Sequence, residues 1–110
     1  MKPQALPLVK QIQQVLAPLG VEAGGNNAFG GPDLSAIARS GVAVFGLALD
    51  GIDYFDLHHT GNDTFDKIEP ARLNQSTAVY ATWAWMAANA PTDFGSLGEF
   101  LVAKAKSEQR

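Results

Sequence analysis

The sequence contains no cysteine, which excludes a disulfide scaffold, a thiolate zinc site and a cysteine nucleophile. It has no uninterrupted apolar run near the ~20 residues that a membrane-spanning helix requires, so we expect no membrane partner. It also has no excess of basic residues, because its net charge is −3, and this argues against a nucleic-acid partner. The start, Met1-Lys2-Pro3-Gln4, leads into an amphipathic segment and not into a signal-peptide apolar stretch.

The 110 residues are enough for a single domain that spans residues 1–110. Hydrophobic residues make up 46% of the chain and charged residues 17%, a balance that argues against disorder. A chain of this mass exposes roughly 17,000 Å² when unfolded and roughly 6,000 Å² when compactly folded. We therefore expect a compact soluble domain with a real core.

Acidic side chains concentrate in the middle of the chain. Residues 41–70 hold six of the eleven acidic residues and one basic residue, Lys67, and both histidines lie in the same stretch. Carboxylates around imidazoles could hold a cation or could simply form a solvated loop, and a solvated loop is the commoner role of such a charge run.

Helical periodicity is clear in two places. The first helix is expected to begin near Pro3 and Pro7 and to end at Gly20, and the longest helix to run from Pro70 to about residue 89. We expect the apolar stripe of the longest helix to pack closely against a sheet; its members are Leu73, Thr77, Tyr80, Ala81, Ala84 and Ala88. A short helix from Leu34 to Ser40, capped by Asp33, and a final helix from Ser96 complete the helical expectations.

One segment has the character of a buried strand. Residues 42–49, Val-Ala-Val-Phe-Gly-Leu-Ala-Leu, show no polar alternation, which is typical of a strand covered on both faces. Residues 21–23 could form a second, short strand before a glycine-rich loop. The fold class predicted from these elements is α/β, with a partial mixed sheet of few strands packed with helices. The aromatic pair Trp83 and Trp85 could be a ligand platform, although packing is the commoner role.

The segment that bears most chemistry is His58-His59-Thr60-Gly61-Asn62-Asp63-Thr64. Adjacent side chains of an extended segment point to opposite sides, so the two imidazoles are not expected to serve one metal ion together. One of them would face a site while the other packs or forms a hydrogen bond. On its own such a pair is more often structural or exposed to solvent than metal-binding.

Three stretches together resemble the C-terminal part of the co-catalytic zinc aminopeptidase and glutamate carboxypeptidase family, in particular its members similar to plasma glutamate carboxypeptidase. The resemblance runs from about residue 5 to residue 90. The stretches are Gly30-Gly31-Pro32-Asp33, residues 41–47 and residues 53–70, and the third carries a His-Thr-x-x-Asp-Thr signature followed by an acid-Pro pair.

The resemblance implies a role for five residues. His59, directly before the threonine, would bind one of two zinc ions. Asp63 and Thr64 would shape the loop and orient the imidazole, with His58 beside them as a supporting residue. Asp33 would act as a helix cap and loop anchor, or lie near the metal. The resemblance also implies a peptide substrate and paired zinc ions that polarise the scissile carbonyl.

The sequence lacks the family's other motifs: the His-x-Asp motif, the Glu-Glu pair and a further acidic ligand. The chain is therefore expected to correspond to the C-terminal portion of a zinc exopeptidase domain that hydrolyses short peptides, and to be inactive alone. The alternative is an inactive truncated domain that acts as an oligomerising or interaction module. A homo-oligomer formed through exposed sheet edges is expected. The resemblance suggests a periplasmic or secreted protein, and the residues alone do not fix the compartment.

Overall fold

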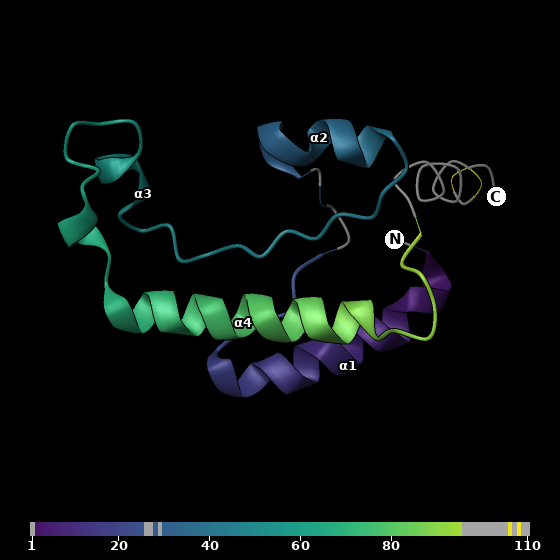
Figure 1. Ribbon diagram of the computed structural model, residues 1–110. Helices are drawn as coiled ribbons and strands as arrows, with labels where there is room; N and C mark the ends of the chain where they lie inside the picture. Colours follow the sequence, from purple (N-terminus) through teal and green to yellow (C-terminus); the bar gives the residue numbers. More distant parts are fainter. Residues whose placement is uncertain (1, 26–27, 29, 96–105, 107, 109–110) are drawn as a thin grey trace.

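The computed structural model describes residues 2–25, 28, 30–95, 106 and 108. Within these residues every regular element is helical, and Figure 1 shows their arrangement. The α-helices are α1 (Leu6–Leu16), α2 (Gly31–Arg39), α3 (Tyr54–Leu57) and α4 (Pro70–Ala88). Short 3₁₀ turns are η1 (Pro3–Ala5), η2 (Ala17–Leu19) and η3 (Phe65–Lys67).

The core lies between α1 and α4, which run side by side (Figure 1). Helix α1 begins at a proline-rich entrance, and it buries Val9, Ile12 and Leu16 on one face. Gly20 ends the following turn in a left-handed conformation, with φ of 76°, as the sequence predicted. From α4, Val79 completes this core, and Phe94 joins it from the segment that follows.

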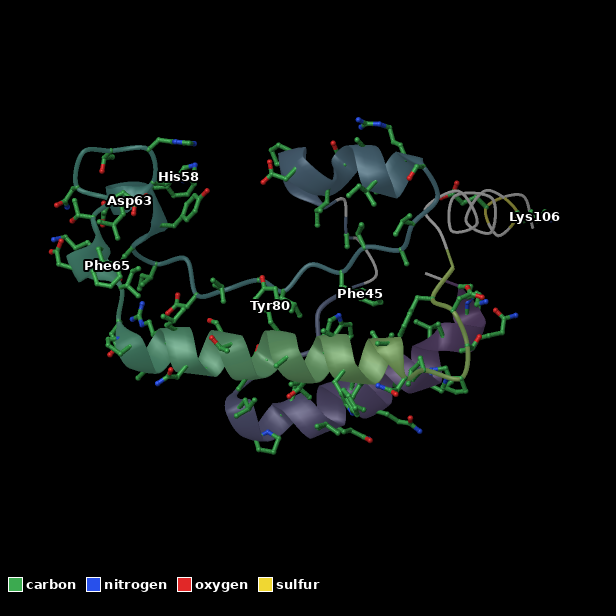
Figure 2. All side chains as sticks on the ribbon, in the orientation of Figure 1. Phe45, His58, Asp63, Phe65, Tyr80 and Lys106 are labelled. Carbon is green, nitrogen blue, oxygen red and sulfur yellow. The ribbon has the colours of Figure 1, made fainter. Side chains whose placement is uncertain are left out.

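The buried face of α4 is not the face that its sequence suggested. Val79 is 8% exposed, and Trp83 and Met86 pack against the core on the same side. In the predicted stripe, Leu73 and Tyr80 are 54% and 53% exposed, and Tyr80 lies on the side of α4 toward residues 42–49 (Figure 2). Helix α4 carries apolar residues on both faces, so periodicity alone did not identify the packed one.

The predicted α/β fold class is wrong for the part of the chain that the structure describes, because that part contains no strand. Residues 42–49 follow an extended path (Figure 1), but none of the described segments pairs with them as a neighbouring strand. They run along α4 instead, with Ala43, Phe45 and Leu47 packed against the core (Figure 1). A strand requires a partner ladder, and residues 21–23 do not supply one. The described residues therefore have no sheet edges, and the expectation of an oligomer formed through such edges is wrong for this part of the chain.

Helix α2 begins earlier than predicted. Its N-cap is Gly30, with φ of 75°, and Asp33 lies in the first turn without making a side-chain cap hydrogen bond. The carboxylate of Asp33 can therefore favour the helix dipole, but it does not cap the helix. Pro32, whose φ suits a first helical turn, explains the earlier start.

The predicted helix from Ser96 lies outside the described residues. Among the helices that are described, none is long and apolar enough to cross a membrane. The chain is extended for its length: its Cα radius of gyration is 16.3 Å, whereas a compact domain of this size has about 13 Å.

Candidate functional site

The two histidines lie in a lobe formed by residues 50–69 at the N-terminal end of α4 (Figures 1 and 2). Two side-chain contacts join the lobe to α4. Glu69 caps α4 by accepting a hydrogen bond from the backbone N–H of Arg72, 2.9 Å away. The Arg72 guanidinium lies 3.8 Å from the Asp53 carboxylate, just before α3. The acid-Pro pair at 69–70 thus opens the helix, as the sequence predicted.

The imidazoles of His58 and His59 lie together on the surface of this lobe. His58 follows the end of α3, and its ring stacks on that of Tyr54 with centroids 4.3 Å apart and planes 21° apart. The His59 ring lies 3.8 Å from the His58 ring. Both histidines are exposed, so a ligand can reach them.

The backbone of His59 explains why the rings meet. Its φ is 58°, and it is the one described non-glycine residue with a positive φ. This left-handed conformation costs about 1 kcal/mol for a residue with a side chain. The loop is therefore not extended here, and the expectation that the two side chains point to opposite sides is wrong. Strained backbone of this kind is concentrated at functional sites.

Thr60 holds the turn that follows the histidines. Its hydroxyl donates to the carbonyl of Leu57, 2.7 Å away, and accepts from the N–H of Asn62, 3.1 Å away. The N–H of Asp63 donates to the carbonyl of Thr60. Among the described residues the Asp63 side chain has no hydrogen-bond or ion-pair partner, and it lies exposed on the lobe (Figure 2). Thr60 is thus the anchor of this turn, a role that sequence reasoning missed; a threonine two residues before an asparagine is the signal for such a turn.

Thr64 connects this turn to η3. Its hydroxyl donates to Asp66, 2.5 Å away, and the Lys67 ammonium lies 2.5 Å from the other oxygen of the same carboxylate. The hydrogen bond from Lys67, followed by that from Thr64, lowers the pKa of Asp66 from its usual value of 3.8. Asp66 therefore remains ionised and engaged with its neighbours.

No group of three or more metal-binding side chains comes together within the described ranges. Asp33 is on α2, which Figure 1 shows apart from α3 and its lobe. A catalytic zinc ion usually takes three protein ligands. The adjacent imidazoles of His58 and His59 therefore do not hold a zinc ion by themselves.

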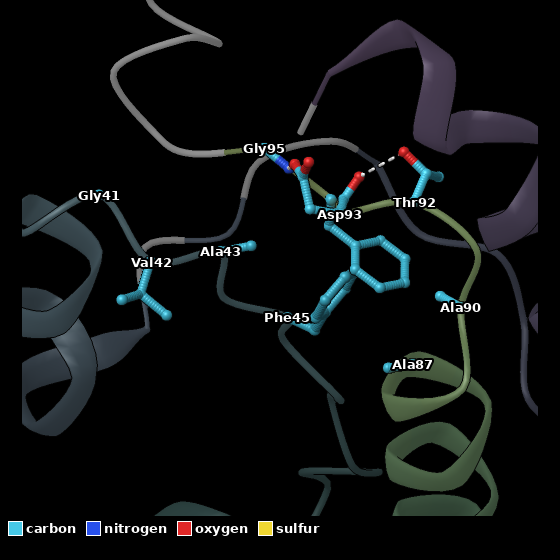
Figure 3. A pocket seen from close by; sticks show the side chains of 10 residues that line it. Gly41, Val42, Ala43, Phe45, Ala87, Ala90, Thr92, Asp93 and Gly95 are labelled. Atoms are coloured by element: carbon cyan, nitrogen blue, oxygen red, sulfur yellow. Dashed lines mark hydrogen bonds between the residues drawn. The ribbon is translucent and has the colours of Figure 1, made fainter.

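An open cavity of about 740 Å³ lies near the other end of α4 (Figure 3). Phe45, Ala87 and Ala90 contribute to its apolar lining. Its carboxylate, Asp93, accepts hydrogen bonds from the Lys2 ammonium at 2.6 Å and the Gly95 N–H at 2.8 Å, and these bonds lower its pKa. The lining of this cavity is apolar apart from a carboxylate that is already hydrogen-bonded, so its residues do not form a set of catalytic groups. The histidine lobe is therefore the better candidate site.

The comparison with known proteins confirms the resemblance. The chain is 30% identical over 86 residues to carboxypeptidase Q of Rattus norvegicus and to carboxypeptidase Q of Mus musculus. Carboxypeptidase Q is a plasma glutamate carboxypeptidase and a zinc peptidase.

The similarity covers 78% of this chain and 18% of each relative. The chain therefore spans less than a fifth of the length of the curated relatives that it matches. No family model matches the sequence. No solved structure matches it either.

Proposed function

We propose that this chain acts as the C-terminal segment of a zinc-dependent exopeptidase domain and supplies His59 as one metal ligand for the hydrolysis of short peptides. The observation that carries this proposal is the His58–His59 pair, held at the surface by the left-handed backbone of His59. The similarity to carboxypeptidase Q supports the peptidase class.

The arrangement suits a histidine that adds one ligand to a metal site formed mainly by other polypeptide. An imidazole that binds zinc must be accessible and its ring must be oriented. His59 is exposed, and stacking on Tyr54 positions the neighbouring ring of His58. Thr60 and Thr64 hold the loop on either side of Asp63. His58 then serves as a positioning residue for His59.

The remaining ligands must come from other polypeptide. Two adjacent imidazoles give too few ligands for a catalytic zinc ion, and a two-metal site requires a bridging group and a general base as well. The proposal therefore predicts activity when the chain is joined to the rest of a related domain and none when it is alone.

A chimera tests this proposal directly. The segment of rat carboxypeptidase Q that aligns with this chain is replaced by the chain's own 86 aligned residues. Zinc content and hydrolysis of dipeptides are then measured, with circular dichroism as the control for folding. His59→Ala is expected to remove most of the activity and to lower the zinc content, whereas His58→Ala is expected to lower activity less. Equal losses from the two variants would contradict the assignment of His59.

A second candidate is an inactive interaction module, which the large exposed surface of the isolated chain favours. The two candidates differ in one assay. Under the second candidate the folded chimera is inactive whichever histidine is present, while the chain still associates with a partner. Chelator-sensitive hydrolysis of dipeptide amides by the chain alone would contradict both candidates, because each predicts an inactive isolated chain.

A further inference from the structure

The open cavity near the C-terminal end of α4 lies where the continuously described chain ends (Figure 3). Its apolar wall includes Phe45 of the extended segment and, around the end of α4, Ala87 and Ala90. Val42, which also lines the cavity, is 52% exposed, although valine is a residue that proteins usually bury. Protein interiors are close-packed, so an apolar wall of this kind beside the core is a surface that another group should cover.

The chain reaches the rim of this cavity by an anchored path. Phe94 is 8% exposed, and its ring meets that of Phe45 edge-on, with centroids 4.9 Å apart. The Phe94 carbonyl accepts a hydrogen bond from the N–H of Lys2, 3.1 Å away. The N–H of Gly95 donates to the Asp93 carboxylate, and Gly95 has a φ of 78°, a left-handed conformation that favours glycine. These contacts fix the point at which the chain leaves the cavity rim.

The sequence beyond the rim has the signature of a helix start. Residues 96–99, Ser-Leu-Gly-Glu, match a capping box, in which the serine and the glutamate three residues later bond to free backbone N–H groups of the first turn. Leu97, Phe100 and Leu101 follow at the spacing of one helix face. Glu99 lies on the side of such a helix opposite Leu97 and Leu101. The pattern therefore predicts an amphipathic helix with one short apolar face.

This apolar face begins within reach of the cavity. Leu97 is two residues beyond Gly95, so their Cα atoms are at most about 7 Å apart. Leu101 is one turn further, about 6 Å along the helix axis. The two described residues beyond this stretch, Lys106 and Glu108, are helical and exposed, as the polar end of such a helix would be. The apolar face and the apolar wall of the cavity are therefore neighbours along the chain.

We propose that the occupant of this cavity is the chain's own C-terminal segment, residues 96–105, which packs Leu97, Phe100 and Leu101 against the apolar wall. A separate molecule is the alternative occupant, and the short connection decides between them. Because the segment is tethered at the rim, its effective concentration at the cavity is in about the millimolar range. A separate molecule must also lose its translational and rotational freedom on binding. The inference does not depend on the peptidase proposal.

Methyl NMR of the intact, carbon-13-labelled chain tests the contact directly. We expect nuclear Overhauser contacts between the ring of Phe100 and the methyl groups of Ala87 and Ala90. In a mixture of labelled and unlabelled chains, isotope-filtered spectra should not contain these contacts, because both groups belong to one chain. Absence of any contact between residues 97–101 and the cavity wall would overturn the proposal. So would contacts that appear in the filtered spectra, since a second copy would then be the occupant.

A matched pair of variants tests the same contact. Phe100→Ser removes the largest apolar side chain of the segment, so the methyl resonances of Ala87 and Ala90 should shift because an aromatic ring no longer lies beside them. Phe65→Ser is the control, since Phe65 is 87% exposed on the histidine lobe, and it should leave both resonances unchanged. Circular dichroism verifies that both variants retain their helices. Unchanged resonances in Phe100→Ser would contradict the proposal.

The absence of cysteine allows a cross-linking experiment. Ala90→Cys combined with Leu101→Cys places one thiol in the cavity wall and one on the segment, so mild oxidation should close a disulfide within the chain, detected by mass spectrometry. Thr77→Cys combined with Leu101→Cys is the control, because Thr77 is exposed on α4 and does not line the cavity. We expect at least tenfold more closed product from the first pair. Equal yields from the two pairs would show that the segment does not occupy the cavity.

Discussion

His59 shows how one backbone angle decides the character of the candidate site. A histidine followed by threonine and glycine gives no strong signal for a left-handed residue, although histidine adopts this region more readily than branched residues do. With φ of 58° the two imidazoles meet, and with an extended backbone they would separate. The sequence identified the residues of the loop, but the conformation that brings them together depends on Tyr54 and Thr60.

Gly30 is a position at which adding a single methyl group should lower the free energy of unfolding. Its φ is 75°, and an added Cβ would lie 2.6 Å from the Cβ of Leu34, too close for any real contact. We expect Gly30→Ala to lower the free energy of unfolding by about 1–3 kcal/mol, because the first turn of α2 must distort. Urea unfolding followed by circular dichroism measures the change. Gly24→Ala, with nothing within 4 Å of its Cβ, should change stability by less than about 0.5 kcal/mol, and equal effects would refute the argument.

The ion pair between Lys2 and Asp93 should give the chain a defined response to acid. The hydrogen bond from Lys2, and then that from the N–H of Gly95, lowers the pKa of Asp93 in the folded chain from the ordinary value of 3.8. The stabilisation is thus complete at pH values well above 3.8 and is lost as the pH falls through the lower, folded pKa. Because the pair is exposed, high salt should weaken it.

A carboxyl-carbon NMR titration measures this response. Lys2→Ala should move the Asp93 midpoint upward toward 3.8, whereas Lys10→Ala should leave it unchanged, since Lys10 makes no contact with Asp93. An unchanged midpoint in Lys2→Ala would show that Lys2 does not perturb Asp93.

At the scale of elements, the sequence predicted the helices better than their packing. Proline at the starts and Gly20 after η2 mark boundaries by local chemistry, so α1 and α4 lie where the pattern placed them. The packed face of α4 depends instead on where α1 and residues 42–49 lie. Apolar residues lie on several sides of α4, so its periodicity does not single out the packed face.

Residues 42–49 do not form the predicted strand, and the reason is related. Their composition predicts an extended conformation, which the structure has, but a ladder depends on a neighbour distant in sequence. In the candidate site, the His-Thr-x-x-Asp-Thr signature identified the residues of the histidine loop. The turn at Thr60 is also a local feature, because a threonine hydroxyl can bond to the backbone of nearby residues. The contact between the two imidazoles and the Arg72–Asp53 pair arise from folding, so the pattern could not give them.

Phe45 should be the main attachment of the extended segment to α4. Its ring meets Trp83 edge-on at 4.7 Å between centroids and Phe94 at 4.9 Å. Because Phe45 is half-buried, we expect Phe45→Ala to cost about 2 kcal/mol, below the 3–5 kcal/mol of a fully buried phenylalanine. Urea unfolding followed by circular dichroism gives the cost. Leu49→Ala, at a side chain that is 66% exposed, is the control, and a cost as large as that of Phe45→Ala would contradict this role.

For the molecule as a whole, the large exposed surface predicts that the free energy of unfolding depends weakly on urea concentration. A compact chain of this mass would expose about 11,000 Å² more when unfolded, whereas this chain, at 8346 Å², would expose about 8,600 Å² more. The urea m-value scales with that area, so it should be about a fifth lower than the value for a compact domain of equal length. Urea unfolding of the intact chain, followed by circular dichroism, measures this m-value.

Small-angle scattering of the chain at low concentration should give a radius of gyration near 16 Å, since the Cα value is 16.3 Å. A value near 13 Å, together with an m-value typical of a compact domain, would mean that the monomer closes over its own apolar surface. The exposed side chains of α4 would then be covered within one chain. If both quantities have the values expected of the extended chain, this surface remains available to other polypeptide, as the proposed function requires.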